Sequence, residues 1–310
     1  MMKKSLIKLV IPLAMVLAMI GFVSCSSLLK SGPYSKKDPG MFTMQLGDFE
    51  IIALQDGSIE MDATLFKTGD RDIIKKYMPE GKLPASVNAY IVKTKTENIL
   101  IDAGGGDSEL FKGKMLEKLE KVSIKPEDIT MILITHAHID HVAGLLSNNK
   151  AVFPNAEILF SKKEITTFTD EALEHLPADI RVYYEPANKV LKIFKERVKP
   201  FKTGSAITEG IDSVDLSGHT PGQVGYLIES DGEKLLIIGD LLHVAAVQFP
   251  HPEYSLVYDA DVPKAVERRK QVLNRVAAEK MPIAGMHIPF PGIGYVAKDG
   301  KGFSFVPIKK

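Results

Sequence analysis

The side chains best suited to chemistry lie in one short stretch, residues 135–141, which reads Thr-His-Ala-His-Ile-Asp-His. Three imidazoles and one carboxylate within it are a dense set of metal ligands for a chain with 8 His in total. Neutral imidazole and carboxylate groups bind zinc and similar divalent ions. We therefore interpret His136, His138, Asp140 and His141 as candidate metal ligands.

Three more candidate ligands follow apolar runs of the kind expected for buried strands. They are His219, Asp240 and His287, and the preceding runs end at Leu216, Ile238 and Met286. The first motif likewise follows an apolar run, residues 129–134. Because strand ends in α/β folds gather at one edge of a sheet, we expect the seven side chains to converge on one pocket. Seven ligands are enough for two metal ions.

The elements that must position these residues are predicted from hydrophobic spacing. Helical spacing occurs over residues 108–122, 162–174 and 261–280, and a short helix is expected over 142–146. Arg269 interrupts the apolar side of the longest helix, so its aliphatic part is expected to lie along the surface. Strands that alternate with helices and end in ligands indicate an α/β layered domain.

The N-terminal part of the domain has β patterning. The runs 42–46 and 49–54 are separated by Gly47 and Asp48, which indicates a hairpin. Asp56 followed by Gly is predicted to form a turn, and residues 62–86 are expected to form a helix and a loop over a site.

A weak internal repeat is also present. Residues 90–101 align without a gap with residues 226–237, and each unit ends in an Asp close to Gly, Asp102 in the first and Asp240 in the second. The repeat predicts two similar half-domains that face each other, with coincidence between two apolar hairpins as the alternative.

Residues 1–24 have the pattern of a secretory signal, with three Lys before a short apolar run. The run is shorter than the about 20 residues needed to span a membrane. The segment resembles a bacterial lipoprotein signal with Cys25 as the lipid-bearing first residue, although Phe22 replaces the usual Leu. An ordinary cleaved signal is the alternative. We expect residues 25–40 to be a tether and 41–310 the catalytic domain, periplasmic or anchored to the membrane.

Composition excludes some classes of function. Cys25 is the only Cys, so residues 41–310 can form no disulfide and offer no thiolate ligand. Removal of residues 1–24 would take away three Lys, leaving 36 basic and 39 acidic residues and a net charge of −3. That charge argues against a nucleic-acid partner.

The motif at 136–141 matches the His-x-His-x-Asp-His signature of the metallo-β-lactamase superfamily. Four further segments resemble the methyl parathion hydrolase branch, which is related to quorum-quenching lactonases. They are residues 218–222, 239–241, 244–249 and 290–294. The resemblance covers about residues 41–310 and implies a four-layer αββα sandwich.

By position, the resemblance also implies a division of the ligands between two metals. His136, His138 and His219 would hold one metal, Asp140, His141 and His287 the other, and Asp240 would bridge them. Zinc is the expected ion, although the same ligands accept manganese, iron or cobalt. A hydroxide shared by the metals would attack the substrate, and Asp140 could pass a proton to the leaving group. Asp102 and Asp56 are expected to hydrogen-bond ligand imidazoles, with a turn-forming role as the alternative.

The expected substrates are small-molecule lactones or aryl esters. Phosphotriesters are the second choice, because a hydroxide nucleophile and Lewis-acid metals would serve hydrolysis of either class. Val247, Phe249 and Phe290 are candidates for an apolar pocket wall, with core packing as the alternative. His243 weakens the phosphotriester assignment, because close phosphotriesterase relatives carry an apolar residue there.

Other functions on the same fold fit less well. The β-lactam-hydrolysing branch usually lacks a bridging Asp at the position of Asp240. The di-iron redox branch resembles His-x-Glu-x-Asp, whereas this chain has His138 at the middle position. A binding protein that holds metal without turnover is a third alternative. The oligomeric state is left open, with a homodimer as one choice.

Overall fold

The computed structural model describes residues 39–108, 111–181 and 183–309. The predicted signal at 1–24, the lipid-bearing Cys25 and all but the last two residues of the tether lie outside the described residues and stay predictions. Among the described helices, none combines the length and the apolar character that crossing a bilayer requires.

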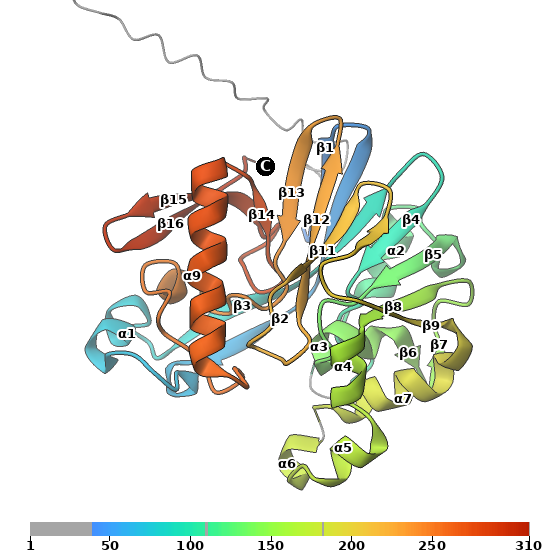
Figure 1. Cartoon of the computed structure of the whole chain (residues 1–310), viewed down its shortest axis with the longest axis horizontal. Helices are drawn as coiled ribbons and strands as arrows, with labels where there is room; N and C mark the ends of the chain where they lie inside the picture. Colours follow the sequence, from blue (N-terminus) through green and yellow to red (C-terminus); the bar gives the residue numbers. More distant parts are fainter. Residues whose placement is uncertain (1–38, 109–110, 182, 310) are drawn as a thin grey trace, which may run out of the picture.

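Two seven-stranded sheets form the centre of the fold (Figure 1). The first has the strand order β1-β2-β3-β4-β5-β8-β9 and is antiparallel up to β4 and parallel from β4 to β9. Its strands are β1 (Met41–Leu46), β2 (Phe49–Asp62), β3 (Lys82–Lys93), β4 (Asn98–Ile101), β5 (Ile129–Leu133), β8 (Glu157–Ser161) and β9 (Val198–Phe201).

The second sheet follows the chain in order from β10 to β16, and only its β13–β14 pair is parallel. Its strands are β10 (Ala206–Thr208), β11 (Ile211–Asp215), β12 (Val224–Ser230), β13 (Glu233–Ile237), β14 (Ile283–Ala284), β15 (Ile293–Asp299) and β16 (Gly302–Pro307). A small separate hairpin consists of β6 (Leu146–Ser147) and β7 (Lys150–Ala151).

The described residues contain nine α-helices besides the sheets. They are α1 (Arg71–Tyr77), α2 (Met115–Lys121), α3 (Ile139–Val142), α4 (Lys162–Thr167), α5 (Asp170–Glu174), α6 (Ala178–Arg181), α7 (Glu185–Phe194), α8 (Ala245–Gln248) and α9 (Val262–Glu279). Short 3₁₀ turns lie at Ala63–Leu65, Pro126–Asp128, Ala143–Leu145 and Lys195–Arg197.

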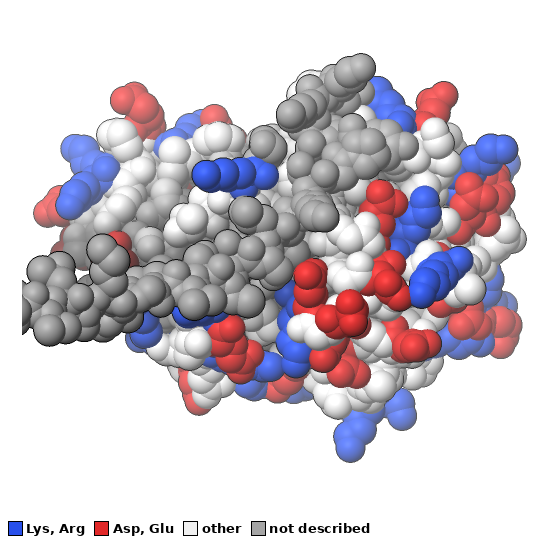
Figure 2. All heavy atoms as spheres, turned by 90° about the horizontal axis from the view of Figure 1, so that it is seen from above, with Lys and Arg blue, Asp and Glu red and all other residues white. Residues whose placement is uncertain are grey.

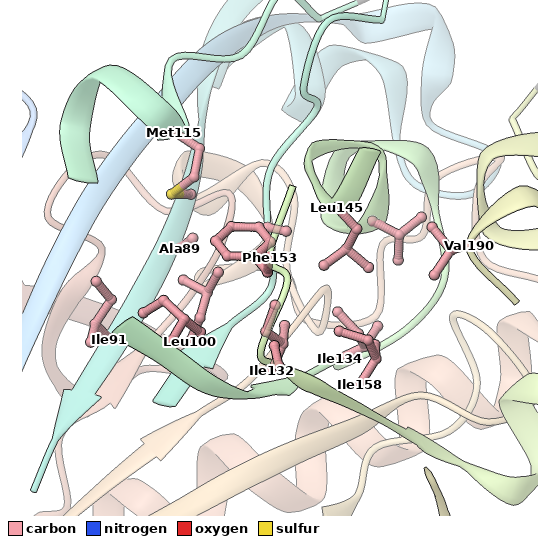
Figure 3. Close-up of a cluster of buried hydrophobic side chains, with 14 of the residues drawn as sticks. Ala89, Ile91, Leu100, Met115, Ile132, Ile134, Leu145, Phe153, Ile158 and Val190 are labelled. Atoms are coloured by element: carbon pink, nitrogen blue, oxygen red, sulfur yellow. The ribbon is translucent and has the colours of Figure 1, made fainter. Parts of the chain in front are cut away.

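Three apolar layers hold this arrangement together. Side chains of α2 and α7, among them Met115 and Val190, pack on the first sheet (Figure 3). Leu273 of α9 packs on the second sheet, and Tyr90 and Tyr226 lie in the core between the two sheets. Burial of apolar surface on both faces of each sheet is the main stabilising contribution. The predicted αββα sandwich is confirmed.

The internal repeat corresponds to equivalent strand pairs. Tyr90 lies opposite Ile101 in the β3–β4 pair, and Tyr226 lies opposite Ile237 in the β12–β13 pair, so the two hairpins have the same register. Each tyrosine also donates a hydrogen bond into the other half of the molecule. The Tyr90 hydroxyl donates to the carbonyl of Gly285 at 2.9 Å, and the Tyr226 hydroxyl donates to that of Ile134 at 2.8 Å. Gly285 lies two residues before His287, and Ile134 lies two residues before His136, so each bond is close to a candidate ligand.

Some local predictions were wrong. Asp56 and Gly57 form no turn, because β2 continues to Asp62 and accommodates Asp56 as the unpaired residue of a bulge opposite β3. The pairing of these long strands lets Met61 reach a buried cluster, and this tertiary packing outweighs the local turn signal. The helix expected within residues 62–86 is present as α1, whereas residues 82–86 belong to β3.

Two predicted helices are shorter than expected. The 108–122 segment becomes helical only at Met115, after Lys112 adopts a left-handed conformation with φ 44°. The 162–174 segment is two helices, because the Thr169 side chain accepts a hydrogen bond from the N–H of Ala172 and starts α5 anew. By contrast, α9 agrees with its prediction to within one or two residues at each end, with Asp261 as the N-cap.

Charged side chains of both signs lie side by side on the surface. On the face drawn in Figure 2, acidic side chains gather near the centre and basic ones are spread around them. This mixture agrees with the balanced composition of 39 basic and 39 acidic residues.

Candidate metal centre

The seven candidate ligands lie together where strands of both sheets end. His136 and His138 follow β5, and Asp140 and His141 lie on α3, which begins earlier than the predicted short helix. His219 lies between β11 and β12, Asp240 follows β13, and His287 follows β14. All are buried except His138, which is half-buried.

Four of these side chains form a first group around one point. The Nδ1 atom of His138 lies 3.1 Å from Nε2 of His136 and 3.0 Å from Nε2 of His219. The Oδ2 atom of Asp240 lies 3.6 Å from both Nε2 atoms. All four atoms lie within 4.8 Å of one another, which is a spacing that one metal ion could occupy.

A second group lies beside the first. The Oδ2 atom of Asp140 lies 3.5 Å from Nε2 of His141 and 3.4 Å from Nε2 of His287. Asp240 contacts this group too, with Oδ1 3.3 Å from His141 Nε2 and Oδ2 2.9 Å from His287 Nε2. One carboxylate therefore contacts both groups.

The chemistry of this donor set fits cations. His141 Nε2 and Asp240 Oδ1 are buried and have no hydrogen-bond partner among the described residues. Burial alone would lower the pKa of His141, but the carboxylates of Asp240, Asp140 and Asp102 together raise it well above its ordinary value. The raised pKa reflects the negative electrostatic potential of these three carboxylates, and the same potential favours binding of a cation. Burial holds the pKa of His136 well below its ordinary value, which leaves its ring neutral and able to bind metal.

The outer nitrogens of four rings are tied to fixed acceptors. The Nδ1–H groups of His141 and His287 donate to Asp102 Oδ2 at 2.7 Å and to the carbonyl of Ser86 at 2.8 Å. His219 Nδ1 donates to Asp259 Oδ1 at 3.1 Å. His136 Nδ1 lies 3.2 Å from the Thr135 hydroxyl, whose own proton goes to Asp102. These contacts fix the tautomer that turns each Nε2 lone pair inward.

Of the two predicted supporting carboxylates, only Asp102 contacts a candidate ligand. Asp56 instead accepts a hydrogen bond from the backbone N–H of Gly105 at 2.8 Å. A Cβ at Gly104 or Gly113 would come within 2.3 Å of its carboxyl group, so Asp56 packs tightly under this loop. The expectation that Asp56 bonds an imidazole was wrong, because the β2 bulge directs its side chain toward the loop before α2.

Sequence reasoning missed Asp259 and misplaced Arg269. Arg269 is 1% exposed, and its Nη2 lies 3.2 Å from Asp259 Oδ2. It also donates to the backbone carbonyls of Leu241, Pro252 and Tyr254. Arg269 lies on the apolar side of α9, and a buried guanidinium requires a nearby carboxylate. This requirement could have directed a search of the sequence toward Asp259.

Two of the three candidates for an apolar pocket wall are buried in cores. Val247 lies in the cluster under α1, and Phe249 stacks on Phe305 beneath α9 with 5.1 Å between ring centroids. Phe290 is half-buried against the core between the sheets. Core packing, the alternative weighed above, is what the structure shows for Val247 and Phe249.

Polar and aromatic rings surround the ligands instead. His243 Nε2 lies 3.2 Å from Asp240 Oδ2, and its ring stacks on His287 with 5.2 Å between centroids. Burial lowers the pKa of His243 to about 4. The Tyr184 hydroxyl lies 3.3 Å from His138 Nε2, and the half-exposed Tyr258 ring lies 5.8 Å from that of His243.

Comparison with known proteins agrees with this geometry. The model of the family described as Metallo-beta-lactamase superfamily matches residues 83–284. The crystal structure of hydrolase AbOPH in the beta lactamase superfamily superposes with a TM-score of 0.81 at 34% identity, over 89% of this chain and 99% of that chain. AidC, a dizinc quorum-quenching lactonase in complex with an N-acyl-L-homoserine product, gives a TM-score of 0.81 at 28% identity, over 87% of this chain and 98% of that chain.

A curated relative belongs to the same branch. The N-acyl homoserine lactonase of Bacillus cereus is 25% identical over 196 residues, which are 54% of this chain and 69% of the relative. The family model spans more than half of the chain, and the similar structures cover nearly all of the described domain. The chain therefore belongs to the metallo-β-lactamase superfamily, and its similarity to lactonases supports the branch that its motifs indicated.

Proposed function

We propose that this metal-dependent hydrolase uses two divalent ions to hydrolyse lactones or aryl esters. The position of Asp240 carries the proposal, because its carboxylate contacts the imidazoles of both ligand groups. A carboxylate shared in this way is what two closely spaced cations require.

The proposed ligand assignment follows the two groups. His136, His138 and His219 hold one ion, Asp140, His141 and His287 hold the other, and Asp240 is shared. We propose zinc, because five imidazoles and two carboxylates suit a borderline ion and because AidC is described as a dizinc enzyme. When bound, the ions supply Lewis acidity toward the scissile carbonyl and lower the pKa of water so that a nucleophile forms near neutral pH.

The protein's own contribution is orientation and proton transfer. Asp102, Asp259 and the Ser86 carbonyl hold three ligand rings in one tautomer, so the site needs little rearrangement when metal binds. Asp140 Oδ2 lies 3.4–3.5 Å from Nε2 of His141 and His287, the other two members of the second group. We assign it the transfer of a proton from the attacking water to the leaving oxygen.

The surroundings favour carbonyl substrates over phosphotriesters. His243 places a hydrogen-bonding ring beside Asp240 and His287, where an apolar side chain would suit a hydrophobic phosphotriester better. AidC, a lactonase whose structure contains an N-acyl-L-homoserine product, shares 28% of aligned residues with this chain. Phosphotriester hydrolysis is the second candidate, because Lewis acidity and a metal-activated water would serve attack at phosphorus as well as at a carbonyl carbon.

A substrate panel tests this proposal. Zinc-loaded protein is assayed on acyl-homoserine lactones, aryl esters, a phosphotriester and nitrocefin, with kcat/KM measured for each. We expect the largest kcat/KM for a lactone or an aryl ester. A fully metal-loaded protein that turns over neither class would overturn the proposal, and a larger kcat/KM for the phosphotriester would favour the second candidate.

Metal removal should lower the thermal stability of the protein. A ligand present at 1,000 times its Kd stabilises the folded state by about 4 kcal/mol. For a domain of this size that corresponds to roughly 8–16 °C in Tm. We therefore expect a chelator to lower the Tm measured by calorimetry, and added zinc to restore it. An unchanged Tm after complete metal removal, verified by elemental analysis, would contradict a preformed two-ion site.

A further inference from the structure

Glu164 is a buried carboxylate that belongs to neither ligand group. It lies in the first turn of α4, is 1% exposed, and forms no ion pair in the part of the chain that the structure describes. A buried carboxylate without a cationic partner is costly unless hydrogen bonds satisfy its oxygens. Its contacts therefore indicate what it contributes.

Two ligand-bearing loops donate hydrogen bonds to Glu164. Its Oε1 accepts from the backbone N–H of Ala137 at 2.9 Å, and Ala137 separates His136 from His138. Its Oε2 accepts from the hydroxyl of Thr220, the residue after His219, at 2.8 Å. The same oxygen accepts from the backbone N–H of Gly222 at 3.0 Å.

The local chain is shaped for this contact. Ser161, the N-cap of α4, accepts from the N–H of Glu164 at 3.1 Å and donates its hydroxyl proton to the carbonyl of Gly222 at 2.6 Å. A Cβ on Gly222 would lie 2.2 Å from the Glu164 backbone nitrogen, so only glycine allows this close approach. Ser161 and Glu164 thus hold both the N–H and the carbonyl of Gly222.

The two loops come from different halves of the fold. The loop of His136 and His138 follows β5 in the first sheet, whereas the loop of His219 joins β11 to β12 in the second. All three rings belong to the first ligand group, and none belongs to the second. Asp102 bonds His141 of the second group directly and contacts His136 of the first group only through the Thr135 hydroxyl.

We propose that Glu164 is a positioning residue that fixes the spacing between these two loops and thereby sets the metal affinity of the first ligand group alone. The proposal rests on the two-ion site of the proposed function. Glu164 contacts loops of the first group alone, whereas Asp102 bonds His141 of the second group directly and reaches His136 only through Thr135.

The effect of Glu164→Gln follows from its hydrogen bonds. An amide has one acceptor oxygen, so its NH₂ group must face at least one backbone or hydroxyl donor that now has no acceptor. Loss of a contact that orients metal ligands typically weakens metal binding about 10–100-fold. We expect this loss in one of the two binding steps and no change in the other.

Calorimetric titration of metal-free protein with Zn²⁺, and absorption spectra with Co²⁺, separate the two steps. Glu164→Gln should weaken one step alone, whereas Asp102→Asn should weaken the other step more strongly, because Asp102 bonds His141 directly and His136 only through Thr135. Thr220→Val, which removes a single donor, should weaken the same step as Glu164→Gln by less, and it is the variant to use if Glu164→Gln does not fold. Glu171→Gln, on the exposed face of α5, is the matched control and should leave both steps unchanged.

The outcomes are distinct from those of the substrate panel. Glu164→Gln with both steps unchanged, or with both weakened equally, would overturn the proposed role of Glu164. A wild-type protein that binds two ions without hydrolysing any lactone or ester would overturn the proposed function and leave the role of Glu164 intact.

Discussion

Asp240→Ala is expected to abolish hydrolysis and to reduce the bound metal from two ions to one or none. The Asp240 oxygens lie 2.9–3.6 Å from Nε2 of His136, His141, His219 and His287. These nitrogens would lose their shared anionic partner. Removing one partner from a buried charge cluster costs about 3–5 kcal/mol, which is roughly 10²–10⁴-fold in a binding constant.

Elemental analysis and kcat/KM on the preferred substrate measure this result. Asp299→Ala is the control, because Asp299 is an exposed Asp at the end of β15 and should leave metal content and activity unchanged. Two ions retained together with persistent activity in Asp240→Ala would show that the shared-ligand role is wrong. Retention of both ions with lost activity would instead place Asp240 in the reaction and not in metal binding.

The convergence of the seven candidate ligands was predictable because each follows a strand with strong apolar patterning. The ends of β5, β13 and β14 are fixed by pairing within a sheet, and the residues after them therefore have little freedom. His219 follows β11 by the same logic. A short motif and the positions directly after strands can both be recognised from the local sequence, so the ligands could be identified without knowledge of the tertiary structure.

Supporting residues were harder to predict because their partners are distant in sequence. Asp259 lies 40 residues from His219, and Glu164 lies 58 residues from Gly222. Neither lies beside a motif, and a buried carboxylate has no signature in hydrophobic spacing. Only the packing of α4 and α9 against the loops brings these groups together.

Local turn and helix signals failed where tertiary pairing was stronger. Asp56 and Gly57 have turn chemistry, yet they lie in a strand pair that extends from Glu50 to Asp62. Val247 and Phe249 lie close to Asp240 in sequence, but α8 and the following loop direct them into two different cores. Sequence proximity to a ligand therefore did not indicate a pocket wall.

Arg269→Met should destabilise the protein far more than Arg268→Met, the same substitution at the neighbouring position of α9. Arg269 is buried, donates to three backbone carbonyls and pairs with Asp259. Burial would raise the pKa of Asp259, but His219 and Arg269 hold it well below its ordinary value, so Asp259 is charged. Leaving that charge uncompensated costs about 3–5 kcal/mol, or roughly 6–20 °C in Tm.

The neighbouring Arg268 provides a matched control. Its side chain is 27% exposed and its Nη2 lies 2.8 Å from Asp215, whose side chain is 44% exposed. Exposed ion pairs contribute about 0.2–1 kcal/mol, so Arg268→Met should lower the Tm by less than roughly 4 °C. Equal shifts for the two variants in thermal melts would contradict a structural role for the buried pair.

A double variant separates the buried charge from the support of the metal site. Asp259→Asn combined with Arg269→Met removes both charges, so its loss of stability should be smaller than the sum of the two single losses. The affinity for the first ion should stay low in the double variant even where stability recovers, because the His219 ring still loses its anionic partner. Stability that recovers while affinity for the first ion stays low would show that Asp259 links the buried pair to the metal site. Recovery of both would assign Asp259 to stability alone.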